Sequence, residues 1–296
     1  MFMVIIIELI KQENWIISAP GVIFSKTKES VVCEILTDWF NKSVEYKNLM
    51  KKAYKAGDTV MGEFYNRRQH AYKIKLNDVY GVFALNSWRY TDGHKMISKA
   101  ITLTGHRLTQ ESIIFCNKIM NERLGTNNKD YIVTSDTDSL FIHVKDLLRA
   151  EGVDLTDKAA CIAATLELAT EIQSLANKHL DTLVVDLFNL HDRPHYFELK
   201  QEVVIERGYF SGKRRYAMYI VNKEGVTTDE LDMKGLDLMK SNFPPLFRKF
   251  GEHILNEVMF GTKKSSIDKQ ILEFRESLRT VGWEQIMKPT GLKKMQ

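Results

Sequence analysis

Apolar positions in the first third of the chain repeat with the period of an α-helix. From about residue 29 to residue 56 they fall at Val32, Ile35, Leu36, Trp39, Phe40, Tyr46, Leu49, Met50 and Ala53. Gly57 and Asp58 interrupt this pattern, and a second helical pattern runs from about residue 59 to residue 84. The two patterns predict an antiparallel helical hairpin.

Further along the chain, helical and strand-like patterns are mixed. Helical periods return at about residues 95–122 and 157–190, and strand-like runs occupy residues 131–144, 201–206, 215–221 and 226–228. Because helices and strands do not alternate regularly, the pattern predicts an α+β fold rather than a doubly wound parallel sheet.

The first ten residues form an apolar run that Glu8 interrupts. The run lacks a basic leader and a small-residue cleavage site, and it is too short to span a bilayer. We therefore predict a buried strand here and no membrane partner. Cys33, Cys116 and Cys161 lie far apart without paired spacing, which is typical of a protein of a reducing cytoplasm, the host cytoplasm if the source is a virus.

The charge of the chain is concentrated on one segment. The net charge of the 296 residues is only +4, but residues 42–75 hold nine Lys or Arg against Glu45, Asp58 and Glu63, which is +6. The remainder is about neutral, so the positive field is focused on the predicted helical hairpin. Such focusing indicates a polyanionic partner.

The strand-like run at residues 131–144 carries Asp136 and Asp138 two positions apart, between β-branched residues. It predicts a β-hairpin with an acidic tip. Residues two apart in a strand point to the same side, so both carboxylates can approach one object unless a tight turn splays them. Mg²⁺ is the hard cation that such ligands suit. An ordinary acidic β-turn is the competing interpretation, and the run alone does not decide between them.

On the second predicted helix, Lys73, Asn77, Tyr80 and Ala84 fall at i, i+4, i+7 and i+11 and share one stripe beside Gly81. This stripe suits a nucleoside triphosphate, with lysine for the phosphates and a flat tyrosine and small glycine for the base pair. Taken alone, it is more often a solvated lysine beside a core tyrosine.

Residues 212–216 place three consecutive cations, Lys213, Arg214 and Arg215, between Gly212 and Tyr216. In a strand, Lys213 and Arg215 would face one side and Arg214 the other, so that phosphate and groove contacts with a nucleic acid are made together. The competing interpretation is a solvated edge strand whose charge opposes aggregation.

Taken together and in this order, the three signals resemble the family B DNA polymerases, especially the replicative enzymes of tailed bacteriophages. Residues 73–81 are similar to the fingers motif K-x-x-x-N-S-x-Y-G, with Asp78 in place of serine. Residues 134–139 resemble the palm motif Y-G-D-T-D-S, and residues 212–216 are similar to the primer-gripping K-K-R-Y motif. Residues 200–202 resemble the short carboxylate-bearing strand that precedes this motif.

The resemblance implies a palm made of an antiparallel sheet with helices, fingers made of an antiparallel helical hairpin, and a truncated helical thumb. The corresponding ranges are residues 1–29 for palm-remnant strands, 30–85 for the fingers, 86–233 for the palm with the acidic hairpin and the primer-grip strands, and 234–296 for the start of the thumb.

The resemblance also implies a role for each motif residue. Asp138 is expected to bridge two Mg²⁺ ions, which Mn²⁺ can replace, with Asp136 and Glu202 as further ligands. The residues expected to bind the incoming deoxynucleoside triphosphate are Lys73, Asn77, Tyr80, Gly81 and Lys47. Those expected to bind primer-template DNA are Gly212, Lys213, Arg214, Arg215 and Tyr216. Ser43 stands where the family's R-x-x-x-K pair carries arginine.

The family's second palm aspartate lies in D-x-x-S-L-Y-P, upstream of the fingers, and no such run precedes Ser30. The chain thus resembles the carboxy-terminal part of a split or truncated polymerase. We expect a DNA-directed DNA polymerase that adds deoxynucleotides to a primer by two-metal phosphoryl transfer, together with an amino-terminal chain that supplies the aspartate and the exonuclease. A sliding clamp is a further candidate partner. The alternative is a catalytically inactive DNA-binding remnant.

Overall fold

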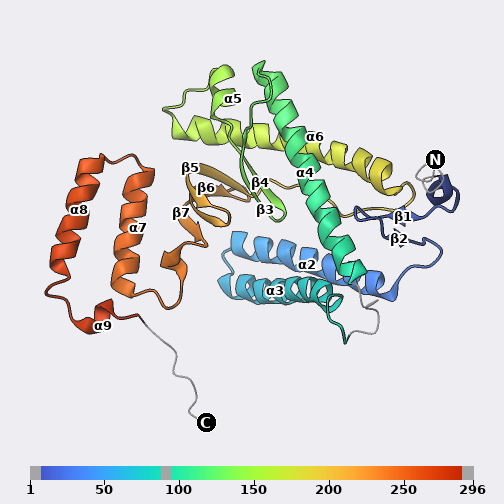
Figure 1. Ribbon diagram of the computed structural model, residues 1–296, viewed down its shortest axis with the longest axis horizontal. Coiled ribbons are helices and arrows are strands. Elements are labelled where there is room, and N and C mark those ends of the chain that lie inside the picture. Colours follow the sequence, from blue (N-terminus) through green and yellow to red (C-terminus); the bar gives the residue numbers. More distant parts are fainter. Residues whose placement is uncertain (1–7, 88–94, 289–296) are drawn as a thin grey trace, which may run out of the picture. The chain divides into compact units, whose positions relative to one another are not determined.

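The computed structural model describes residues 8–87 and 95–288 (Figure 1). The chain divides into two compact units, one formed by Met1–Phe115 and Ala176–Glu198 and the other by Cys116–Leu175 and Leu199–Gln296. Two long helices, α4 (Met96–Leu124) and α6 (Lys158–Phe188), contribute residues to both units. The predicted helical patterns at residues 95–122 and 157–190 are confirmed by these helices.

The first unit contains the predicted helical hairpin, formed by α2 (Val31–Lys55) and α3 (Thr59–Val82), which lie side by side in Figure 1. Side-chain oxygens cap both helices: Ser30 accepts from the backbone N–H of Val32 at 3.3 Å, and Asp58 accepts from that of Met61 at 3.0 Å. Gly57 adopts φ +78° in the short connection, a conformation that glycine tolerates well. The caps and this glycine explain why the helix ends could be predicted.

Before α2, the described residues do not form the buried strand that we predicted for the opening run. Residues 8–12 are helical, and the backbone N–H groups of Glu13 and Trp15 donate to the carbonyls of Leu9 and Ile10. A helical turn satisfies its own backbone groups and therefore needs no partner strand. Residues 1–7 of the predicted strand lie outside the described residues.

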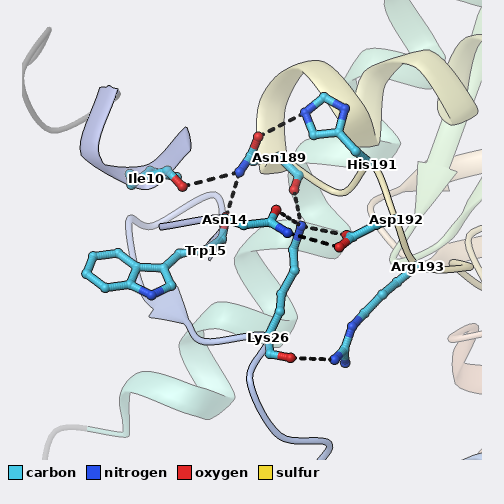
Figure 2. A network of polar contacts seen from close by, with 8 residues as sticks. All are labelled: Ile10, Asn14, Trp15, Lys26, Asn189, His191, Asp192 and Arg193. Atoms are coloured by element: carbon cyan, nitrogen blue, oxygen red, sulfur yellow. Dashed lines mark hydrogen bonds and ion pairs between the residues drawn. The ribbon is translucent and has the colours of Figure 1, made fainter. Parts of the chain in front are cut away.

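After this turn, β1 (Ile16–Ile17) pairs with β2 (Ile23–Phe24), and Lys26 follows at the centre of a polar network (Figure 2). The Nζ of Lys26 donates to Asn14 Oδ1 at 2.7 Å, to the carbonyl of Asn189 at 2.9 Å and to Asp192 Oδ1 at 2.8 Å. The Lys26 side chain is only 6% exposed, so its three N–H donors are matched by three acceptors.

Asn189 extends this network at the end of α6, where its φ of +56° is the left-handed conformation typical of a residue that follows a helix. Its side-chain amide donates to the carbonyls of Trp15 at 2.9 Å and Ile10 at 3.4 Å. Arg193 in turn donates to the carbonyl of Lys26 at 2.8 Å. The network ties the segment before α2 to the end of α6 (Figure 2).

The second unit contains two antiparallel sheets. β3 (Ile132–Asp136) and β4 (Ser139–Ile142) form a hairpin, and β5 (Val203–Gly212), β6 (Arg215–Lys223) and β7 (Val226–Lys234) form a meander in that order. Residues 216–222 of the central strand β6 are buried or half-buried, and Tyr216, Met218 and Ile220 form a core with Phe141, Val203, Ile205 and Phe210. The predicted strands are confirmed, and β5 and β7 extend beyond the predicted runs.

The remaining elements of the second unit are helical. They are α5 (Lys145–Ala150), the 3₁₀ helix η1 (Asp237–Met239), α7 (Pro245–Met259), α8 (Lys264–Ser277) and α9 (Trp283–Ile286). Helices combined with antiparallel sheets confirm the predicted α+β class. Within residues 8–87 and 95–288, no helix has both the length and the apolar composition needed to cross a membrane.

The Lys26 network predicts a specific pH dependence of stability. The hydrogen bonds from Lys26 and Asn14 lower the pKa of Asp192 from 3.8 to about 2. Because the pKa is depressed in the folded state, the stabilisation is present above pH 3.8 and is lost as the pH falls toward 2. Asp192→Asn should therefore lower the thermal midpoint near neutral pH, and the difference from wild type should disappear across this window.

Asp186 provides a matched control for this measurement, because among the described residues its exposed side chain makes no hydrogen bond or ion pair. Asp186→Asn should leave the thermal midpoint nearly unchanged, both near neutral pH and at pH 2. A difference between wild type and Asp192→Asn that persists unchanged at pH 2 would contradict the role of the ionised carboxylate.

Candidate active site

The acidic tip that we predicted is a tight turn. Asp136 ends β3 and pairs with Ser139, which leaves Thr137 and Asp138 as the two connecting residues. The backbone N–H of Asp138 donates to the carbonyl of Asp136 at 2.7 Å, and the hydroxyl of Ser139 donates to the same carbonyl at 3.1 Å. We call residues 136–139 the acidic turn. Asp138 lies in the turn and not in a strand, so the alternation of side chains along a strand applies to Asp136 only, and the tight turn is the alternative that the structure supports.

The backbone of the acidic turn is strained at one residue. Thr137 has φ +59°, and a β-branched residue is rare in this left-handed region. Such strain costs on the order of 1–3 kcal/mol and concentrates at functional sites. The side chain of Asp136 is 24% exposed and that of Asp138 is exposed, so solvent reaches both carboxylates.

The three consecutive cations also lie at a hairpin tip. Gly212 pairs with Arg215, and Lys213 and Arg214 form the two-residue connection between β5 and β6. We call residues 212–215 the basic turn. The predicted alternation of these side chains along a strand is wrong, because the chain reverses at Lys213. Arg214 adopts φ +59° at this reversal, and the side chains of all three cations are exposed.

The acidic turn and the basic turn are in contact. The Nε of Arg214 donates to Asp136 Oδ1 at 3.0 Å, and its Nη2 donates to the hydroxyl of Thr137 at 3.2 Å. The two residues with left-handed backbone are therefore hydrogen-bonded to each other. Since the guanidinium is a planar fork, it can hold a carboxylate and a hydroxyl together.

An aromatic cluster lies behind this contact. The ring of Phe141 on β4 is 5.8 Å from that of Tyr216 and 6.2 Å from that of Phe210, centroid to centroid. Tyr216 is only 2% exposed. It thus packs the two hairpins together and does not present its ring to solvent, which differs from the prediction that it touches DNA.

Arg215 has a carboxylate partner of its own. Its Nη2 donates to Asp237 Oδ2 at 2.9 Å, and Lys240 binds the other oxygen of Asp237 at 2.6 Å. Lys240, and secondly Arg215, hold the pKa of Asp237 below its usual value. By contrast, the side chain of Lys213 makes no ion pair or hydrogen bond to any residue that the structure describes.

Gly235, which directly follows β7, lies close to the basic turn. It adopts φ +64°, and a Cβ at this position would lie 1.9 Å from the carbonyl oxygen of Arg214. Only glycine permits this close approach of the two backbones. Sequence reasoning missed the contacts of both Gly235 and Asp237, because the predicted strand-like run at residues 226–228 stops well before them, whereas β7 extends to Lys234.

Glu202 does not join the acidic turn, and its predicted place in the metal site is wrong. It precedes β5, at the end of the sheet where Val203 pairs with Lys223, whereas the basic turn lies at the opposite end. At about 3.3 Å per residue, β5 separates these ends by roughly 30 Å. Accordingly, no cluster of three His, Cys, Asp or Glu able to hold a metal occurs among the described residues.

The residues predicted to bind nucleotide belong to the first unit. Lys73, Asn77, Tyr80 and Gly81 lie on α3 and are exposed, and Lys47 lies on α2 and is half-buried. Their spacing along one helix agrees with the predicted stripe. Ser43, at the position of the family's arginine, is buried within the helical hairpin.

A model of a single protein family matches most of this chain. The model is described as DNA polymerase family B, and it aligns with residues 10–290. The chain belongs to DNA polymerase family B.

Curated members of family B are similar to this chain at low identity. The DNA polymerase alpha catalytic subunit of Oryza sativa subsp. japonica is 22% identical over 251 residues, which cover 83% of this chain and 14% of the rice protein. The DNA-directed DNA polymerase of Enterobacteria phage T4 is 21% identical over 236 residues, covering 75% of this chain and 25% of the phage protein.

The DNA-directed DNA polymerase of Escherichia phage RB69 is 22% identical over 192 residues, covering 60% of this chain and 20% of that protein. The chain thus spans between 14% and 25% of the length of these three relatives. Since plant and phage enzymes match at similar identity, a closer relationship to the tailed-phage enzymes stays a prediction.

The contact between Gly235 and Arg214 can be tested by comparing two glycine substitutions. Gly225→Ala places a Cβ in open space at φ +83°, so it should cost only the left-handed strain of about 1–2 kcal/mol. Gly235→Ala introduces the same left-handed strain and also displaces the Arg214 carbonyl, so it should lower the free energy of unfolding by about 3–4 kcal/mol. Urea unfolding of both variants measures the difference, and equal costs would contradict the close approach.

Proposed function

We propose that this chain forms part of a DNA-directed DNA polymerase that adds deoxynucleotides to the 3′ end of a primer. The observation that carries the proposal is the contact of an acidic turn with a basic turn through Asp136 and Arg214, in a chain of family B. This contact brings ligands for a hard cation and donors for a phosphate backbone to one surface.

In this proposal residues 86–233, with α4, α5, α6 and both sheets of the second unit, are the palm, to which β1 and β2 also belong. The fingers are α2 and α3. The helices α7, α8 and α9 are the start of the thumb. The finer assignment rests on the motifs that these elements carry.

The acidic turn fits a divalent cation that is shared with substrate. Mg²⁺ is usually held by one or two carboxylates and completes its shell with water and phosphate oxygens, and Asp136 and Asp138 supply such carboxylates. When bound, two such ions lower the barrier to phosphoryl transfer by activating the primer hydroxyl and neutralising the charge on the leaving pyrophosphate. Mn²⁺ suits the same oxygen ligands.

The cations divide into two roles. Lys73, supported by Lys47, is positioned on the helical hairpin to hold the triphosphate, and Asn77, Tyr80 and Gly81 are proposed to line the nascent base pair. In the second unit, Lys213, Arg214 and Arg215 hold the phosphate backbone of the primer-template. Gly212 and the buried Tyr216 position the basic turn.

We further propose that a second polypeptide completes the site. Two-metal catalysis needs another carboxylate near the acidic turn, and the described residues supply only Asp136 and Asp138 there. An amino-terminal polymerase chain would provide this carboxylate and the exonuclease, and a sliding clamp is a further candidate partner. A DNA-binding remnant without catalysis is the second candidate function, which the same lack of a third carboxylate favours.

Primer extension tests the proposed function. It is measured for the complex of this chain with an amino-terminal polymerase chain that carries the D-x-x-S-L-Y-P motif. We expect extension by the complex and none by this chain alone. Asp138→Ala should lower the rate of extension by several orders of magnitude, because a ligand shared by both ions is lost. Duplex binding should persist. Extension by wild-type chain alone would contradict the need for a partner, and Asp138→Ala with about a tenth of wild-type activity would contradict its role as a metal ligand.

Lys73→Ala provides a contrast in the same complex. This substitution should raise the apparent KM for the nucleotide, by about tenfold for the loss of one phosphate contact, and should leave duplex affinity nearly unchanged. Single-nucleotide incorporation across a nucleotide series separates this effect from that of Asp138→Ala. If no Asp138-dependent extension is obtained from a complex that binds duplex, the DNA-binding remnant is the better account.

A further inference from the structure

We propose that Arg214 couples the binding of a divalent cation at the acidic turn to the binding of primer-template DNA at the basic turn. The inference rests on the proposed function, because it takes Asp136 as a metal ligand and Arg214 as a DNA contact. It adds a regulatory link between the two, in which one side chain serves alternately as the counterion of a carboxylate and of a phosphate.

The geometry carries this coupling. Arg214 uses two of its N–H groups on the acidic turn, one on Asp136 Oδ1 and one on the hydroxyl of Thr137. The oxygen that accepts from Arg214 belongs to the carboxylate that would bind the cation. A guanidinium and a divalent cation on one carboxylate repel each other, so metal binding at Asp136 weakens the hold on Arg214.

The release of Arg214 matters because the same guanidinium is needed at the basic turn. In the DNA-free chain, a phosphate that approaches Arg214 must compete with Asp136, and one that approaches Arg215 must compete with Asp237. Among the described residues, Lys213 has no carboxylate partner, so it is the one of the three cations that a phosphate can bind without competition. Freeing Arg214 should therefore strengthen duplex binding.

The backbone restricts how Arg214 can respond. Thr137 and Arg214 both have φ +59°, so each turn is held in a sparsely populated conformation. Gly235, directly after β7, lies so close to the backbone of Arg214 that a Cβ there would be 1.9 Å from its carbonyl oxygen. The side chain of Arg214, 65% exposed, is then the part that redistributes between carboxylate and phosphate.

Thermodynamic linkage gives the inference a reciprocal form. If the cation tightens duplex binding by a certain factor through Arg214, the duplex tightens cation binding by the same factor. The chain would then bind duplex most tightly when the acidic turn holds the metal ion, so that metal binding and duplex binding favour each other.

The experiment is a double-mutant cycle on this chain, with fluorescence anisotropy of a labelled primer-template duplex as the readout. Affinities are measured in EDTA and in millimolar Mg²⁺ at matched ionic strength. For wild type we expect Mg²⁺ to tighten binding about fivefold or more. Asp136→Asn should already bind more tightly in EDTA and gain little from Mg²⁺, because Arg214 is free in both buffers.

Arg214→Ala should bind duplex more weakly and lose the Mg²⁺ effect. In the Arg214→Ala background, Asp136→Asn should no longer tighten binding, which assigns the gain to this pair of side chains. Asp138→Asn is the matched control, since it removes the same charge from the same turn but does not contact Arg214. It should tighten binding in EDTA clearly less than Asp136→Asn. Thermal unfolding of each variant confirms that it is folded.

Four results would overturn the coupling. Arg214→Ala with the full wild-type Mg²⁺ effect would mean that the cation bridges the duplex to the carboxylates directly. Equal gains from Asp136→Asn and Asp138→Asn would mean that bare charge removal explains the effect. Duplex binding by wild type that does not respond to Mg²⁺ contradicts the coupling alone, whereas no duplex binding in either buffer contradicts the proposed function as well.

Discussion

The ion pair between Arg214 and Asp136 joins two turns that lie 78 residues apart in the sequence, and the candidate active site of the second unit depends on it. The contact places cations that suit a phosphate backbone beside carboxylates that suit Mg²⁺. It is exposed, so it contributes little to stability in water. Its alignment comes instead from the packing behind it, where Phe141 on one hairpin meets Phe210 and Tyr216 on the other.

The backbone around this contact is equally constrained. Thr137 and Arg214 both adopt the left-handed conformation, and Gly235 allows β7 to pass against the carbonyl of Arg214. Local strain of this kind persists only where surrounding structure imposes it, and the pairing of β3 with β4 and of β5 with β6 does so here. The acidic turn and the basic turn are therefore both positioned by paired antiparallel strands.

Most helices and strands could be predicted because local signals mark them. The Ser30 and Asp58 caps mark the starts of α2 and α3, and β-branched residues on both sides of Asp136 mark the acidic hairpin. The predictions that failed are those that depend on where the chain reverses its direction. The cations at residues 213 and 214 occupy a turn, so their side chains do not alternate between the two faces of a strand as predicted. Glu202 lies at the far end of β5, and no local sequence pattern encodes this distance. The partnership of Asp237 with Arg215 was missed for the same reason, since it joins residues from different elements.

The central claim is that the acidic turn binds a divalent cation beside the basic turn. Titration of the isotope-labelled chain with substoichiometric Mn²⁺, followed by nuclear magnetic resonance, tests it directly, because a paramagnetic ion broadens only the signals of nearby nuclei. The account predicts that the amide signals of residues 136–139 and of residues 213–214 broaden together, that the signal of Glu202 is spared, and that Asp138→Asn weakens the effect. Broadening centred on Glu202, or an acidic turn that responds while residues 213–214 do not, would contradict it.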